Sequence, residues 1–191
     1  MARPGDRHRY PGGVEMEVVV AAEASGDRAL ELLWHVPVGA RLVALPHVHA
    51  DVDEHFLIEA GTARHWLGRR RLLARAGDGW VVPAGTAHVH PGNVGEEPLV
   101  VRQWIQVDAA DPALLRGVER YFETVSSLAA QGRVDRFGRI KDPLQEAVTL
   151  SETLMPGTWF AGIPIPAQRA LLERLAALGR RRGRVAEPSP L

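Results

Sequence analysis

The sequence predicts an all-β core followed by a helical segment. From about Val14 to Val107 the chain is a series of short segments rich in Val, Leu, Ile and Trp, separated mostly by Gly, Pro, Asp or Asn. Many short apolar segments at close spacing indicate an antiparallel sandwich or barrel rather than alternating strands and helices. After Val107 apolar residues recur at helical spacing, which predicts about three C-terminal α-helices.

The composition is that of an ordinary globular protein with a single core. The chain has 191 residues, of which 46% are hydrophobic and 24% charged, and its formal net charge is zero. A neutral chain has no general attraction for nucleic acid or anionic lipid, so we expect neither as a partner. There is no cysteine, which excludes disulfides, thiolate metal sites and a cysteine nucleophile. Histidine and carboxylate are the strong metal ligands that remain.

Three segments follow from the changes in composition. Residues 1–13 are charged and rich in Pro and Gly, and are predicted to be an N-terminal arm. Residues 14–107 form the β-barrel, and residues 108–191 form the helical extension with a frayed basic tail. No signal-peptide core and no apolar run of roughly 18 residues is present. A cytoplasmic location is therefore expected.

The helical extension carries recognisable helix starts. Asp111-Pro112 and Asp142-Pro143 each combine an N-cap residue with a proline at the first helical position. A third helix is predicted from Pro166 to about Leu178.

The apolar faces of these helices must be covered. Packing on the outside of the barrel, or against a dimer partner, is the simplest arrangement. A lid over the barrel mouth, with Trp159 or Phe160 touching substrate, is the alternative.

The stretch "PHVHADVDEHFLIEAG" at residues 46–61 concentrates potential metal ligands. Alternate residues of a strand share a face, so His47 and His49 can point into the barrel together. Glu54 begins the next predicted strand and can reach the same point, and His88 begins a later strand after a Pro–Gly turn. Three imidazoles and one carboxylate suit a divalent transition metal and leave coordination positions for water, substrate or dioxygen.

These residues resemble the two motifs of the cupin family. The first motif, G-x5-H-x-H-x3,4-E-x6-G, is matched by His47, His49, Glu54 and Gly61. The second, G-x5-P-x-G-x2-H-x3-N, is matched by Gly77, Pro83, Gly85 and His88. Arg41 stands at the leading glycine of the first motif, and Asn93 lies one residue late in the second. Neither position binds metal in the family, so these departures concern the turns and not the ligands.

The resemblance implies a double-stranded β-helix, or jelly roll, that holds one divalent metal per chain: Fe, Mn, Ni or Zn. It also implies metal-dependent chemistry on a small, largely apolar substrate, with a dioxygenase or other oxygenase placed first. A metal-dependent isomerase, lyase or decarboxylase is the alternative, and a non-catalytic ligand-binding or sensing cupin is the rival class. A homodimer is expected by resemblance.

Other polar residues near the predicted site are candidates for supporting roles. His90 shares the face of His88 and is a candidate proton carrier, although a structural histidine fits equally well. Gln103 and Trp104 are neighbours on one predicted strand, so only one of them faces the interior. His55 follows Glu54 directly and should point away from the site, which favours a structural role.

Overall fold

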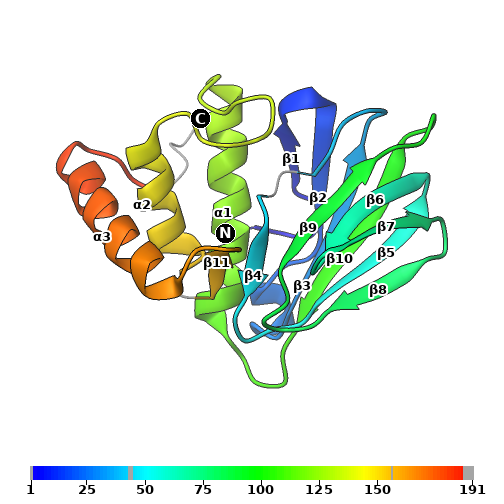
Figure 1. Ribbon diagram of the computed structural model, residues 1–191, viewed down its shortest axis with the longest axis horizontal. Coiled ribbons are helices and arrows are strands. Elements are labelled where there is room, and N and C mark those ends of the chain that lie inside the picture. The colour runs from blue at the N-terminus through cyan, green and yellow to red at the C-terminus, as the bar shows by residue number, and fades with distance from the viewer. Residues whose placement is uncertain (1, 43–44, 156, 187–191) are drawn as a thin grey trace.

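The computed structural model describes residues 2–42, 45–155 and 157–186. Two antiparallel sheets pack face to face, and three helices lie to one side of them (Figure 1). This arrangement confirms the predicted all-β jelly-roll core followed by three C-terminal helices. Among the described residues, no helix is both long and apolar enough to cross a membrane.

The first sheet has six strands, and their spatial order is β1 (Arg7–Tyr10), β2 (Val14–Val20), β3 (Ala29–Val36), β10 (Leu99–Gln106), β5 (Glu54–Ala60) and β8 (Gly79–Val82). The second has five, in the order β11 (Thr158–Phe160), β4 (His47–His49), β9 (His88–Asn93), β6 (Thr62–Leu67) and β7 (Arg70–Arg75). The helices are α1 (Pro112–Ala130), α2 (Pro143–Thr153) and α3 (Ile165–Arg181), with two short 3-10 helices, η1 (Pro11–Gly13) and η2 (Glu23–Ser25).

The N-terminal segment differs from the predicted arm. Its residues 7–10 form strand β1, which pairs with β2 at the edge of the first sheet. Arg7 forms an ion pair with Glu17 across the two strands, and Tyr10 is buried. The charged residues that suggested an arm therefore lie on the solvent side of an edge strand, where charges are common.

Helix α1 docks on the first sheet through an aromatic cluster. Trp34 of β3 contacts Phe122 of α1 edge-to-face at 5.1 Å and Tyr10 at 5.6 Å between ring centroids. The Tyr10 hydroxyl donates to the carbonyl oxygen of Phe122 at 3.1 Å. Burial of each large aromatic side chain stabilises the fold by roughly 2–3 kcal/mol, so these contacts anchor the extension to the barrel.

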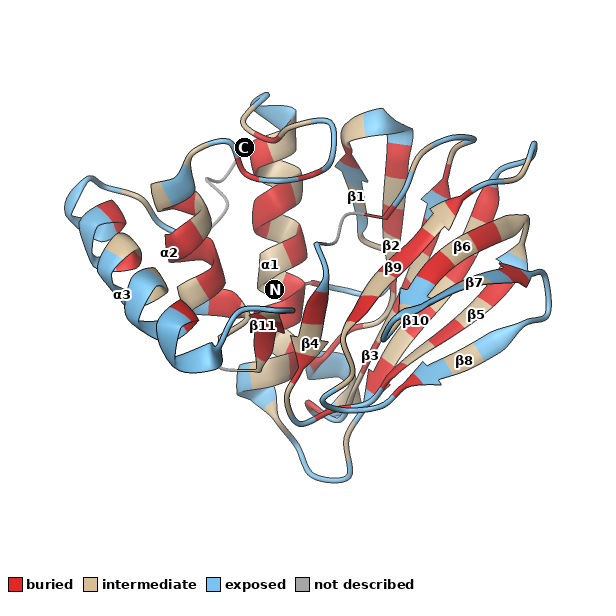
Figure 2. Ribbon diagram, viewed as in Figure 1, coloured by how far each residue is buried: buried red, intermediate tan, exposed pale blue. Residues whose placement is uncertain are grey.

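The helices begin where the Asp–Pro pairs predict. The Asp111 carboxylate accepts from the Leu114 amide at 3.0 Å, and Asp142 accepts from Leu144 at 2.9 Å. Helix α3 packs on α2 and keeps its outer face in solvent (Figure 2). The basic tail, predicted to be frayed, is packed against the protein at Ala186. This residue is buried, and its carbonyl oxygen accepts a hydrogen bond from the Thr124 hydroxyl. Residues 187–191 lie outside the described part of the chain.

His65 on β6 is an unusual interior residue. It is 4% exposed and its ring stacks on Trp80 with centroids 3.9 Å apart. In the described residues neither ring nitrogen has a hydrogen-bond partner, and burial lowers the pKa of His65 from its ordinary 6.5 to about 4. The folded chain therefore keeps this ring neutral at pH values where the unfolded chain would protonate it.

The lowered pKa predicts an acid-sensitive contribution to stability. This contribution is complete above about pH 6.5 and is lost as the pH falls toward 4, because the unfolded chain binds the extra proton first. His65→Phe keeps the stack and removes the titration. As the pH falls from 6.5 toward 4, the unfolding free energy of metal-free wild type should therefore decrease relative to that of metal-free His65→Phe. The difference should grow by up to about 1.4 kcal/mol per pH unit. Urea unfolding at several pH values measures this, and parallel pH profiles for the two proteins would contradict it.

Candidate metal centre

Five potential ligands converge between the two sheets. They are His47, His49, Glu54, His88 and His90, and their ligand atoms all lie within 4.8 Å of one another. The histidines come from β4 and β9 of the second sheet, and Glu54 comes from β5 of the first. All five residues are buried. The four predicted ligands are therefore brought together, and His90 lies within the same cluster.

Three histidine rings are oriented by partners behind them. Nδ1 of His47 lies 2.8 Å from the Leu45 carbonyl oxygen, and Nδ1 of His88 lies 3.1 Å from that of Thr86. A carbonyl oxygen only accepts, so both Nδ1 atoms carry the proton and the Nε2 lone pairs are left for the cluster. Nδ1 of His49 lies 3.1 Å from the Thr158 hydroxyl, which orients the ring and can act as either donor or acceptor.

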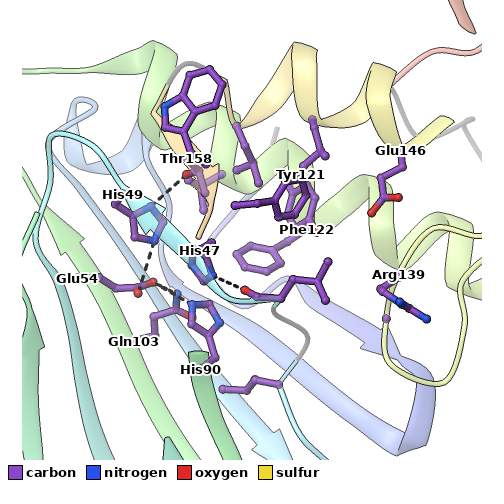
Figure 3. A pocket seen from close by; sticks show the side chains of 18 of the residues that line it. His47, His49, Glu54, His90, Gln103, Tyr121, Phe122, Arg139, Glu146 and Thr158 are labelled. Carbon is purple, nitrogen blue, oxygen red and sulfur yellow. Dashed lines mark hydrogen bonds and ion pairs between the residues drawn. The ribbon is translucent and has the colours of Figure 1, made fainter. Parts of the chain in front are cut away.

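Glu54 is held from the opposite side by a two-step hydrogen-bond chain. The Trp34 indole donates to Oε1 of Gln103 at 2.6 Å, and Nε2 of Gln103 donates to Oε1 of Glu54 at 2.5 Å. Because an indole N–H can only donate, it fixes which way the Gln103 amide points. The carboxylate is thus positioned by a hydrogen-bond donor on the neighbouring strand (Figure 3).

The protonation states suit metal binding. Burial lowers the pKa of His47 well below its usual value, with His90 contributing next, and burial also lowers the pKa of His90. Burial by itself would raise the pKa of Glu54, but His90, His49 and His88, in their protonated forms, supply charge and hydrogen bonds that hold it well below its usual range. A carboxylate beside neutral imidazoles is the form that binds a cation.

The cluster contains acceptor atoms that face one another without a donor. Nε2 of His88 lies 2.8 Å from Oε2 of Glu54, and within the described chain neither atom has a hydrogen-bond partner. Nε2 of His49 is likewise buried without a partner, 3.6 Å from the same oxygen. Two buried lone pairs at this distance repel each other unless a cation lies between them. The residues therefore fit a divalent metal, held by the three imidazoles and Glu54.

A cavity of about 290 Å³ opens from the cluster toward the helical extension. Its walls are mostly apolar and come from the barrel, from α1 and α2, and from the loop at residues 137–139. Phe122 of α1 lies over the cavity (Figure 3), and Val118 of the same helix and Leu150 of α2 line it as well. The extension therefore encloses the space in front of the candidate metal centre.

The structure distinguishes between the two candidates on β10. Gln103 is 3% exposed and faces the cluster, whereas Trp104 lies on the other face of the sheet and stacks on His55 at 5.0 Å. The sequence alternation along β10 could have indicated this orientation, because Gln103 shares its face of the strand with the apolar residues Leu99, Val101 and Ile105. Trp104 is therefore not a pocket residue, and His55 points away from the site as predicted.

Trp159 and Phe160 line the cavity, but not as a separate lid. Both lie on β11, which pairs with β4 so that Trp159 is opposite Val48 and Phe160 is opposite His47. Strand β11 extends the second sheet, and hydrogen bonding of its backbone to the ligand strand holds it in place. The short apolar segment between two helices carried no local signal for this long-range pairing.

Thr158 is a supporting residue that sequence inspection missed. It lies opposite His49 in the β4–β11 pairing, and its hydroxyl is the only described partner of Nδ1 of that ring. An ordinary threonine in the extension has no spacing that links it to a motif more than a hundred residues earlier. The helical extension therefore contributes directly to the orientation of a candidate ligand.

Thr158→Val is expected to weaken metal binding without removing a ligand. Valine has a similar shape but cannot hydrogen-bond to His49, so the affinity for the metal should fall about 10-fold or more. Titration of metal into the apo-protein by calorimetry measures the change. Thr153→Val, at a buried threonine that bonds only to its own helix, is the control and should bind metal as wild type does. Equal affinity in both variants would contradict the role of Thr158.

The geometry defines a class of protein: a double-stranded β-helix with a buried His/Glu cluster at the mouth of an apolar cavity. Residues 32–106 match the sequence model of the cupin domain. The chain therefore contains a cupin domain, with a 3-His-1-Glu-like site, and this domain is followed by a C-terminal helical extension. The search of curated protein sequences gave no match.

Solved structures with similar folds include three bacterial proteins. A predicted oxalate decarboxylase from Thermotoga maritima aligns with TM-score 0.48 and 23% identity over 55% of this chain and 92% of its own. Lactobacillus farciminis oxalate decarboxylase aligns with TM-score 0.46 and 17% identity over 56% of this chain and 32% of its own. An uncharacterized Klebsiella pneumoniae protein with a double-stranded β-helix domain aligns with TM-score 0.42 and 20% identity, covering 58% and 85%. Similarities this low carry no information about activity.

Proposed function

We propose that the protein is a metal-dependent enzyme that oxygenates a small, largely apolar substrate. The observation that carries this proposal is the position of the His/Glu cluster, which faces a cavity of about 290 Å³ with mostly apolar walls. This volume is at the lower end of the range for small-molecule sites, so the substrate is small.

His47, His49, Glu54 and His88 would hold one divalent ion, and their mixture of imidazole and carboxylate suits Fe, Mn, Ni or Zn. When bound, such an ion supplies Lewis-acid polarisation and, if it is redox-active, dioxygen chemistry.

The residues of the chain itself prepare the site for such a reaction. Val118, Phe122 and Leu150 form part of a roof that keeps bulk water from the reacting end of the substrate. The apolar walls favour a substrate with a hydrocarbon body and leave the ligand cluster as its polar anchor. A substrate with two neighbouring oxygens, as in an enol or a diol, fits such an anchor.

The position of His90 supports a role for this residue in proton transfer at the same site. It lines the cavity, Nε2 lies 3.4 Å from Oε1 of Glu54, and within the described residues neither ring nitrogen has a hydrogen-bond partner. Because burial keeps the ring neutral, it can accept a proton from a substrate hydroxyl at a ring nitrogen. The same observation favours the second candidate, a metal-dependent isomerase, lyase or decarboxylase, in which proton transfer is the main protein-assisted step.

The experiment has two steps. Elemental analysis of protein purified without added metal should give about one equivalent of Fe, Mn or Ni per chain. Protein loaded with that metal is then screened against apolar enols and diols in an oxygen electrode, with Glu54→Gln as the inactive control. Consumption of O2 and substrate together supports the oxygenase. Equal turnover without O2 would replace it with the Lewis-acid candidate, and failure to bind any of the four metals would contradict both.

A further inference from the structure

The end of the cavity away from the histidines is polar. It is lined by Tyr121 of α1, Glu146 of α2 and Arg139 of the preceding loop, whereas Glu54 and its histidines lie at the other end (Figure 3). The metal-centre residues do not require these three groups, and the apolar walls separate the two ends. The cavity therefore has a second polar site in addition to the ligand cluster.

Glu146 has no partner of its own in the described parts of the chain. Neither a hydrogen bond nor an ion pair to its carboxylate occurs there, although the side chain is only partly exposed. Arg139, whose positive charge acts on Glu146, is engaged elsewhere: its guanidinium binds the Asp135 carboxylate at 2.9 and 2.8 Å. Burial accordingly raises the pKa of Glu146, with Asp135 adding to the rise and Arg139 opposing it.

Tyr121 adds a second polar group to the same place. Its ring lines the cavity, and over the described ranges its hydroxyl makes no hydrogen bond. Burial raises the pKa of Tyr121 to about 12, and the negative charge of Glu146 contributes to this rise. The two residues thus line the same cavity, and among the described residues neither the hydroxyl nor the carboxylate is engaged by another group.

We propose that Glu146, assisted by Tyr121, binds a hydrogen-bond donor at the far end of the substrate. The substrate is then a small amphipathic molecule with metal-binding oxygens at one end, an apolar middle and an alcohol or amine at the other. This inference rests on the proposed function, because it assumes that the near end of the substrate is anchored at the metal.

The charges at this end select against an anionic group. Glu146 would repel a carboxylate or phosphate, and the positive charge of Arg139 is already compensated by Asp135. A donor that fills the site satisfies a half-buried carboxylate that otherwise has no partner, and hydrogen bonds to charged groups are the stronger ones. A substrate analogue ending in a methyl group would leave Glu146 unpaired, which is an effective means of discrimination.

The test uses straight-chain hydroxamic acids as probes, because a hydroxamate chelates a divalent metal. A series of increasing chain length is prepared in two forms, one ending in a hydroxyl and one in a methyl group. Calorimetry gives the dissociation constant of each for metal-loaded wild type, Glu146→Leu and Tyr121→Phe. At the chain length that spans the cavity, the hydroxyl form should bind wild type about 10-fold more tightly than the methyl form. This preference should disappear in Glu146→Leu and shrink in Tyr121→Phe.

The control is Glu152→Gln, at an exposed residue of the same helix, which should keep the full preference. The metal content of every variant should equal that of wild type, because none of these residues lies in the ligand cluster. A preference for the methyl form at every length, or a hydroxyl preference that survives in Glu146→Leu, would overturn the inference while leaving the proposed function intact. If no probe bound more tightly to the metal-loaded protein than to the apo-protein, the proposed function itself would fail, and the inference with it.

Discussion

Glu54→Gln is expected to reduce the affinity for a divalent metal at least about 100-fold while leaving the β-sandwich folded. The glutamine side chain has nearly the same shape but no negative charge, and among the described residues Glu54 is the only carboxylate of the candidate metal cluster. Its carboxylate oxygens lie 2.8 Å from Nε2 of the candidate ligand His88 and 3.4 Å from Nε2 of the neighbouring His90. The loss of a first ligand exceeds the 10–100-fold typical of a supporting residue.

Metal per chain by elemental analysis and affinity by calorimetry measure the effect, and circular dichroism reports the fold. Glu59→Gln is the matched control, because Glu59 lies on the same strand but is paired with Arg102 on the outer face of the sheet. It should bind metal normally. Full metal occupancy in Glu54→Gln would show that the cluster is not the metal site, and a loss of β-structure would show that Glu54 is required for folding instead.

Gly117→Ala is expected to lower the unfolding free energy by about 2–3 kcal/mol, with a fall in melting temperature of roughly 5–10 °C. A β-carbon at this position of α1 would overlap the carbonyl oxygen of Thr153 at the end of α2. This oxygen is backbone, so it cannot move aside as a flexible side chain would. The two helices would have to separate, and the cavity roof that they form together would widen.

Thermal and urea unfolding test this prediction. Ala113→Gly, at an exposed position in the first turn of the same helix, controls for helix propensity and should cost about 1 kcal/mol or less. A stability for Gly117→Ala within the range of this control would mean that α1 and α2 are not packed as closely as the structure shows.

Much of this protein was predictable from local sequence. The spacing of His47, His49, Glu54 and His88 predicted residues that the structure brings into one cluster, because the period of two along a strand determines which side chains share a face. The Asp111-Pro112 and Asp142-Pro143 pairs located two helix starts, since capping depends on neighbours in the chain. The all-β core and the three helices followed from apolar periodicity.

The tertiary structure alone decided how distant segments complete the site. Strand β11 joins the sheet of β4 and brings Thr158 to His49. Gln103 reaches Glu54 from the neighbouring strand of the same sheet, which is distant in sequence, and the loop and helices of the extension carry Arg139 and Glu146 to the far end of the cavity. Each of these contacts joins residues from separate segments of the chain, and single-sequence patterns record only near neighbours. The sequence by itself therefore determined the fold class and the candidate ligands, whereas long-range packing determined the cavity and its chemistry.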